Sequence, residues 1–179
     1  EPYARDENLA RPWAVPGMPG LAHRVGGLEK EDVTGDISYD PQNHQKMVSL
    51  RAAKVAKVAE SIPDLEVFGP STGELLVVSW GSTYGAARMA IERAQRKGLP
   101  VSHAHLRWLN PMPRNLGDVL RGFRRVLVPE LNLGHLARLL RAEYLVNARR
   151  LNRVTGRPFT LTEIFEAVEQ ALKEDVASW

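Results

Sequence analysis

Three short stretches of the sequence carry side chains whose types and spacing could do chemistry. The first is Gly81-Ser82-Thr83, which closely follows the apolar run at residues 75–78. A hydroxyl at a helix N-terminus, with free backbone N–H groups, can hold a phosphate or a carboxylate. Alternatively, Ser82 or Thr83 only caps the next helix, which stabilises it by about 1 kcal/mol. We favour the cap, because neither the G-x-G-x-x-G spacing of a dinucleotide site nor a phosphate-loop motif is present.

The second stretch consists of Glu130, Asn132 and Gly134, which follow another apolar run. A carboxylate at the end of a buried strand could act in acid–base catalysis or bridge two subunits. Alternatively, Glu130 caps the following helix or pairs with an arginine, which we favour because no nucleophile or second placed carboxylate accompanies it. We therefore group Glu130, Asn132 and Gly134 with Arg107 as a possible interface or strand-end site, and we assign no catalytic residue.

The third stretch contains His103 and His105, two residues apart on an expected strand. Side chains at this spacing point the same way, so the pair could bind a metal ion with a third ligand. No acid or histidine obviously completes such a set. We therefore expect half-buried, hydrogen-bonded histidines and no metal site.

Arginines gather around the same part of the chain, at positions Arg107, Arg114, Arg121, Arg124 and Arg125. One interpretation is a solvated surface that faces a partner. The other is a surface that attracts an acidic protein or a phosphate-bearing cofactor. RNA binding is not expected, because no aromatic stacking platform accompanies these charges.

Alternating strands and helices must position these side chains. Residues 75–80 are apolar at nearly every position, which is typical of a parallel strand covered on both faces. Further strands are expected at 65–68, 101–108 and 124–129, and helices at 84–97, 115–121, 134–150 and after the capping box Thr160-Leu161-Thr162-Glu163. This order predicts a three-layer, doubly wound α/β domain over residues 64–179, with a mainly parallel sheet and the 81–83 loop at a switch point.

Residues 1–63 differ from the rest of the chain. Proline and glycine are so frequent in residues 1–40 that neither a helix nor a strand is expected there. We expect an irregular arm that docks on a neighbouring surface through Trp13, Val15, Met18 and Leu21. Asp40-Pro41 is a good helix start, and a connector helix should run to about Ser61.

Composition excludes several classes of site. The 179 residues contain no cysteine, so neither a disulfide nor a thiolate ligand for zinc or an iron–sulfur cluster is available. No apolar run approaches the roughly 20 residues that cross a bilayer, and no signal peptide is recognised. We expect a cytoplasmic protein with neither a membrane nor a nucleic acid as partner. Because residue 1 is Glu, the chain is expected to be a processed or excised piece.

Six groups of residues, in order along the chain, resemble segments of one enzyme family. They are Gly26-Gly27-Leu28-Glu29 with Gly35 and Asp40-Pro41; His44, Met47, Arg51 and Lys54; Gly81-Ser82-Thr83 with Gly85; Arg107-Trp108-Leu109-Asn110-Pro111-Met112-Pro113; Glu130, Asn132, Gly134 and Leu136; and Gly156, Pro158 and Phe159. Together they resemble the C-terminal part of the alpha subunit of 2-oxoacid:ferredoxin oxidoreductases, in particular the 2-oxoglutarate type. Lys30 and His135 depart from the histidine and glutamine usual there.

The resemblance implies a fold like the C-terminal domain of transketolase. It also implies an enzyme that oxidatively decarboxylates a 2-oxoacid with coenzyme A, thiamine diphosphate, Mg and iron–sulfur clusters, and passes electrons to ferredoxin. In that family the beta subunit holds the thiamine pyrophosphate and the cluster cysteines, so this chain is expected to bind no cofactor.

The resemblance thus favours a non-catalytic domain that supports subunit assembly and shapes the wall of the active-site channel. Its partners would be the preceding alpha-subunit domain, the beta subunit and, through the complex, ferredoxin. Two alternatives stay open: a free-standing module that binds an anionic metabolite at Ser82 and Thr83, and an oligomerisation domain that forms a homo-oligomer.

Overall fold

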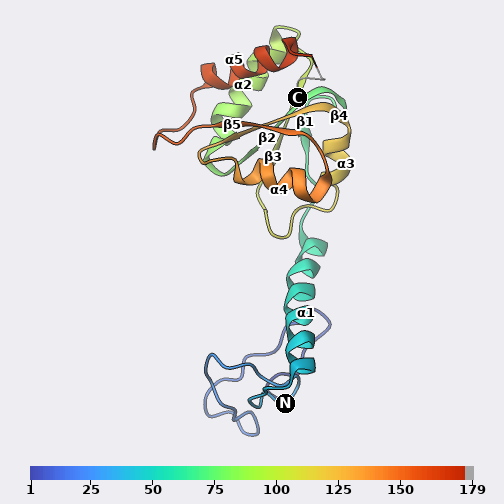
Figure 1. Ribbon diagram of the computed structural model, residues 1–179, viewed down its shortest axis with the longest axis vertical. Helices are drawn as coiled ribbons and strands as arrows, with labels where there is room; N and C mark the ends of the chain where they lie inside the picture. The colour runs from blue at the N-terminus through green and yellow to red at the C-terminus, as the bar shows by residue number, and fades with distance from the viewer. Residues whose placement is uncertain (176–179) are drawn as a thin grey trace. The chain divides into compact units, whose positions relative to one another are not determined.

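A computed structural model describes residues 1–175, which divide into two compact units, Glu1–Ser61 and a second unit from Ile62 onward (Figure 1). In the first unit, α1 (Pro41–Lys57) is followed by a 3-10 turn, η1 (Val58–Ser61). The carboxylate of Asp40 accepts hydrogen bonds from the backbone N–H groups of Gln42 and Asn43, and proline occupies the first turn. The expected start of this helix is therefore confirmed, and its last turn tightens from α to 3-10 geometry.

Ion pairs join α1 to the irregular segment before it. Asp32 pairs with Arg5 and with Lys46, the latter at 2.7 Å. Glu29 pairs with Arg51 at 3.2 Å and is hydrogen-bonded to Nδ1 of His44 at 2.6 Å. Met47 is the one residue of α1 that is buried, so apolar packing of this helix on the preceding segment is limited.

The apolar side chains of the arm are exposed. Trp13 is 88% exposed, Val15 53% and Met18 45%. Leu21 is half-buried. The docking of these residues on a neighbouring surface stays a prediction, because within residues 1–175 the side chains of Trp13, Val15 and Met18 are left uncovered.

The second unit is built on a five-stranded sheet with the order β1-β3-β2-β4-β5. The strands are β1 (Val67–Phe68), β2 (Gly73–Trp80), β3 (Val101–Leu106), β4 (Phe123–Glu130) and β5 (Ala148–Asn152). All pairs are parallel except β1 with β3 at the edge. The predicted α/β class and mainly parallel sheet are confirmed.

Helices cover both faces of this sheet, as Figure 1 shows. After the turn η2 (Gly81–Thr83) come α2 (Tyr84–Arg96), α3 (Leu116–Arg121), α4 (His135–Tyr144) and α5 (Leu161–Lys173). The apolar faces of α2 and α5 share one core with β2, and α3 and α4 share the other. Among the described helices none is long and apolar enough to cross a membrane.

The chain between α4 and α5 corrects the sequence prediction. The helix expected to reach residue 150 ends at Tyr144, where Leu145 takes a left-handed conformation with φ of 54°. Residues 148–152 instead form the parallel edge strand β5, in which Ala148 pairs with Val126 and is fully buried. Only this tertiary pairing makes a strand of the arginine-rich sequence. The strand expected at 101–108 likewise ends at Leu106, which leaves Arg107 in the following loop.

The connections define a switch point in the sheet. From β2 the chain crosses over α2 to β3 on one side, and it then passes over α3 to β4 on the other side of β2. The carboxyl ends of β2 and β4 therefore meet where the strand order reverses, which is the usual ligand crevice of open α/β sheets. Trp80 and Glu130 are the residues at these two ends.

Close packing of α2 requires small side chains. Ala87, Ala90 and Ala94 are fully buried in the core that α2 shares with α5. We predict that Ala90→Leu lowers the free energy of unfolding by about 1–3 kcal/mol, because the added carbons have no free volume. Urea denaturation measures the effect, with Met89→Leu at an exposed position of the same helix as control. Equal stabilities of the two variants would contradict the prediction.

Candidate functional site

At the switch point, Glu130 is fully buried and accepts four hydrogen bonds. Its Oε1 accepts from the backbone N–H of Leu136 at 2.8 Å, from the indole Nε1 of Trp80 at 3.3 Å and from the amide Nδ2 of Asn132 at 3.2 Å. Its Oε2 accepts from the backbone N–H of Ala137 at 3.1 Å. The favoured interpretation, that Glu130 caps the following helix, is confirmed.

Asn132 completes this cap. Its Oδ1 accepts from the backbone N–H groups of Gly134 at 2.7 Å and His135 at 2.9 Å. The first three N–H groups of α4 are thus bound by side chains of the same loop. Gly134 has φ of +88°, and a Cβ there would lie 2.3 Å from Cδ of Arg150 on β5. This loop therefore needs glycine, and its polar atoms are used by the fold.

Across the crevice, the 81–83 loop forms the turn η2. The hydroxyl of Thr83 donates to the carbonyl of Trp80 at 2.8 Å and accepts from the N–H of the same residue at 3.2 Å. Thr83 is buried and caps this turn, and no side chain caps α2. The prediction that Ser82 or Thr83 caps the helix was therefore wrong by one turn. Gly81, with φ of +57°, and Ser82 are exposed, and anion binding there stays a prediction.

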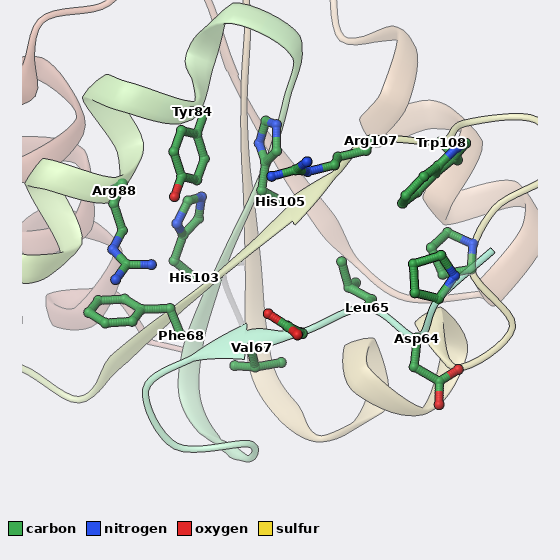
Figure 2. Close-up of a pocket in the computed structure, with 13 residues that line it drawn as sticks. Asp64, Leu65, Val67, Phe68, Tyr84, Arg88, His103, His105, Arg107 and Trp108 are labelled. Atoms are coloured by element: carbon green, nitrogen blue, oxygen red, sulfur yellow. The ribbon is translucent and has the colours of Figure 1, made fainter.

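Arg107 lies away from Glu130, Asn132 and Gly134, in a pocket of ≈ 470 Å³ beside the edge strand β1. Figure 2 shows Tyr84 and Arg88 reaching this pocket from α2, and His103 and His105 reaching it from β3. The predicted site that groups Arg107 with Glu130, Asn132 and Gly134 is therefore not formed as one site, because Arg107 lies in this pocket and the other three lie at the switch point. The pocket brings together the two histidines considered for a metal site and Arg107, whereas Ser82 and Thr83 do not line it.

The two histidines share one hydroxyl. Ser79 Oγ lies 2.7 Å from Nε2 of His103 and 2.8 Å from Nδ1 of His105. Ser79 is fully buried, His103 is 2% exposed and His105 is half-buried. The expected hydrogen bonding of both histidines is confirmed, whereas the expectation that both are half-buried was wrong for His103, which is buried. Within residues 1–175, no three side chains are grouped as metal ligands.

Burial decides the charge of both rings. It lowers the pKa of His103 from 6.5 to about 4, with smaller effects from the charges of His105 and Arg88. Burial also lowers the pKa of His105, and the charge of Arg107 adds to the shift. Both imidazoles are therefore neutral at pH 7, and each can donate from one nitrogen and accept at the other.

Sequence reasoning missed Ser79, Tyr84 and Trp108 as members of the pocket. Ser79 carried a signal, since a single hydroxyl in an otherwise apolar buried strand needs a hydrogen-bond partner. The register that pairs Ser79 with His105 supplies that partner. Tyr84 and Trp108 carried no such signal, because only the path of the chain brings them to the same edge of the sheet.

The lowered pKa of His103 makes stability depend on pH. The unfolded chain binds the proton more tightly than the folded chain, so stability is full above pH 6.5 and falls toward pH 4. We predict a loss on the order of 3 kcal/mol across this range from His103. Urea denaturation of the protein and of His103→Gln at pH 7, 5.5 and 4 isolates this contribution. An equal loss in the variant would contradict the assignment.

Because Glu130 is buried and caps α4, we predict that even its replacement by the similarly shaped glutamine lowers the free energy of unfolding strongly. Glu130→Gln replaces one acceptor oxygen by an NH₂ group that faces N–H donors, so we expect a loss on the order of 3 kcal/mol. Glu143→Gln, at an exposed position of α4, should change stability by no more than about 0.5 kcal/mol. Thermal and urea unfolding of both variants test the difference. A loss in the first variant as small as that in the control would refute the capping role.

Comparisons with known proteins agree on one family. The family model "Pyruvate:ferredoxin oxidoreductase core domain II" matches residues 73–164. The 2-oxoglutarate oxidoreductase subunit KorA of Mycobacterium tuberculosis is 52% identical over 174 residues, 96% of this chain and 26% of that protein. Subunit alpha of 2-oxoacid:ferredoxin oxidoreductase 1 of Aeropyrum pernix is 34% identical over 175 residues, 93% of this chain and 27% of that protein.

A solved structure is also similar, the 2-oxoglutarate:ferredoxin oxidoreductase from Magnetococcus marinus with 2-oxoglutarate, coenzyme A and succinyl-CoA bound. It matches 96% of this chain and 30% of its own chain, with a TM-score of 0.87 and 32% identity. The chain spans about a quarter of the length of the curated relatives named above. The match of the family model runs from β2 through β5 to the start of α5. Together with the relatives and the solved structure, which cover nearly the whole chain, it confirms the resemblance read from the six groups of residues. The chain therefore belongs to the pyruvate:ferredoxin oxidoreductase core domain II family.

Proposed function

We propose that this chain is the C-terminal part of the alpha subunit of a 2-oxoglutarate:ferredoxin oxidoreductase, and that its own role is structural. The full enzyme would oxidatively decarboxylate the 2-oxoacid with coenzyme A, in the cytoplasm. The proposal is supported by 52% identity to a relative named as a 2-oxoglutarate oxidoreductase subunit. It is also supported by the likeness to a structure that carries 2-oxoglutarate and coenzyme A.

The single observation that best supports a structural role is that the polar side chains at the switch point are bound to one another and to the backbone. The usual ligand crevice of this fold is bridged by the contact between Trp80 and Glu130. Both carboxylate oxygens of Glu130 bind N–H groups of the same chain. A carboxylate held in this way stabilises a helix and is not available to move a substrate proton.

The cofactors of the full enzyme would be held elsewhere. Without cysteine the chain has no thiolate to ligate an iron–sulfur cluster. The part of the chain that the structure describes also brings together no set of three metal ligands. The residues therefore do not fit an iron–sulfur cluster, and the proposal also places thiamine diphosphate and its Mg ion elsewhere. In the proposal the beta subunit supplies these groups, and this chain shapes the wall of the channel.

Contact with another domain or subunit would explain why the first unit exposes large apolar side chains. Trp13 is 88% exposed, Val25 86% and Tyr39 84%. Exposed apolar side chains often mark surfaces that pack on another protein. We propose that they contact the preceding alpha-subunit domain or the beta subunit, with ferredoxin as a partner of the complex and a homo-oligomer of the chain as a further state.

The proposal is tested by comparing the enzyme with and without this chain. An alpha subunit that ends before this region is mixed with the beta subunit, with and without the separate chain. We expect the chain alone to reduce no ferredoxin with 2-oxoglutarate and coenzyme A, and its addition to restore the assembled complex and turnover. Gel filtration measures assembly, and reduction of ferredoxin measures activity.

A matched pair of variants locates the contact. Trp13→Ser combined with Val25→Ser should lower the recovered complex at least about tenfold, since two large apolar contacts are lost. Val154→Ser, at a 64% exposed position of the second unit, should leave recovery unchanged. Turnover by the chain alone, or full activity of the truncated enzyme without it, would overturn the proposal.

A further inference from the structure

The pocket beside β1 has no part in the proposed structural role. Its volume is ≈ 470 Å³, and its walls come from α2, β3, the loop after β3, β1 and the segment before β1. Figure 2 shows the side chain of Arg107 extending toward His105, with Asp64 on the opposite side of the pocket. The pocket therefore has a basic wall and an acidic rim.

The two arginines of the pocket differ in how they are engaged. The Nε of Arg88 donates to Glu92 at 2.8 Å, and its guanidinium lies 3.3 Å from the ring centroid of Phe68. The guanidinium of Arg107 makes no hydrogen bond or ion pair with any residue from 1 to 175, and Arg107 is exposed. Its charge is near enough to His105 to lower the pKa of that ring. Arg107 and His105 thus face the same space, and the guanidinium is free to bind a ligand.

The shared hydroxyl limits the states of the two rings. Ser79 has one proton, so it donates to one histidine and must accept from the other when both rings are neutral. If Ser79 donates to Nδ1 of His105, then Nε2 of His105 carries a proton and can donate toward the pocket. In that state Nε2 of His103 donates to Ser79. A ligand that accepts a hydrogen bond from His105 would select this state.

We propose that Arg107 and His105 bind a small oxyanion, either a phosphate or a carboxylate group, and that Ser79 and His103 hold His105 in the tautomer that donates from Nε2. Arg107 supplies the charge and a fork of donors that fits two oxygens. His105 supplies one neutral donor, and Tyr84, with its ring centroid 4.8 Å from that of His105, bounds the site. Ser79 and His103 are positioning residues, because they act on the ligand through His105.

Binding to the full 179-residue chain is measured by calorimetry at pH 7 with inorganic phosphate, with acetate, and with chloride at matched ionic strength. We expect phosphate or acetate to bind and chloride not to bind. The tighter of the two identifies the group that the site prefers. Arg107→Ala should weaken that binding at least tenfold, and Arg107→Lys should recover part of it. Arg157→Ala, an exposed arginine in a distant turn, is the control and should change nothing.

The tautomers of His103 and His105 can be measured directly. They should change on anion binding only if Ser79 and His103 position His105, and not if these residues merely support the fold. Long-range ¹H–¹⁵N spectra assign the protonated nitrogen of each ring. With saturating anion we expect His105 protonated at Nε2 and not at Nδ1, and His103 protonated at Nε2. Ser79→Ala should weaken anion binding several-fold and remove the response of His103, with circular dichroism as the check on folding.

Three results would overturn the inference. These are no binding of either anion above the chloride control, equal binding by the Arg107→Ala variant, and a bound state in which His105 carries its proton on Nδ1. Because Arg107 is exposed and makes no hydrogen bond or ion pair with residues 1–175, its variant remains informative even if Ser79→Ala fails to fold.

Discussion

The buried carboxylate of Glu130 is the interaction on which the second unit depends. A charge removed from water must find compensation, and here the partial positive end of α4 and two side-chain donors provide it. The same four bonds tie the end of β4 to the first turn of α4 and to Trp80 at the end of β2. The switch point of the sheet therefore already contains an anion, and that anion belongs to the protein.

The switch point and the pocket beside β1 differ in how many of their polar groups have hydrogen-bond partners within the fold. At the switch point, Glu130, Asn132 and Thr83 each have partners in the fold. At the pocket beside β1, the guanidinium of Arg107 has no partner in residues 1–175, and the imidazoles use one nitrogen each on Ser79. A fold can satisfy the groups that hold it together and leave others free. Among the described residues, Arg107 in the loop after β3 is one group left free in this way.

The sequence predicted most of what depends on local pattern. The apolar run that became β2, the capping box before α5 and the helix start at Asp40 each followed from neighbouring residues. The strand β5 did not, because its arginines resemble the end of a helix and only pairing with β4 makes it a strand. The pocket was also beyond reach, since Ser79 and the histidines meet through sheet register. The capping role of Glu130 was predicted. The hydrogen bond that the indole of Trp80 donates to Glu130 could not be predicted, because the two residues are far apart in the sequence.

The first unit has a different kind of cohesion. Its helix α1 buries Met47, while Asp32 pairs with Arg5 and Lys46, and Glu29 contacts Arg51 and the ring of His44 on α1. Such pairs near the surface weaken as salt screens them, whereas apolar burial does not. Ionic strength therefore acts on the two units unequally. We expect a rise in salt to weaken the contacts between the arm and its helix more than it weakens the sheet and its two cores, so the order of the arm should depend on ionic strength more than that of the second unit.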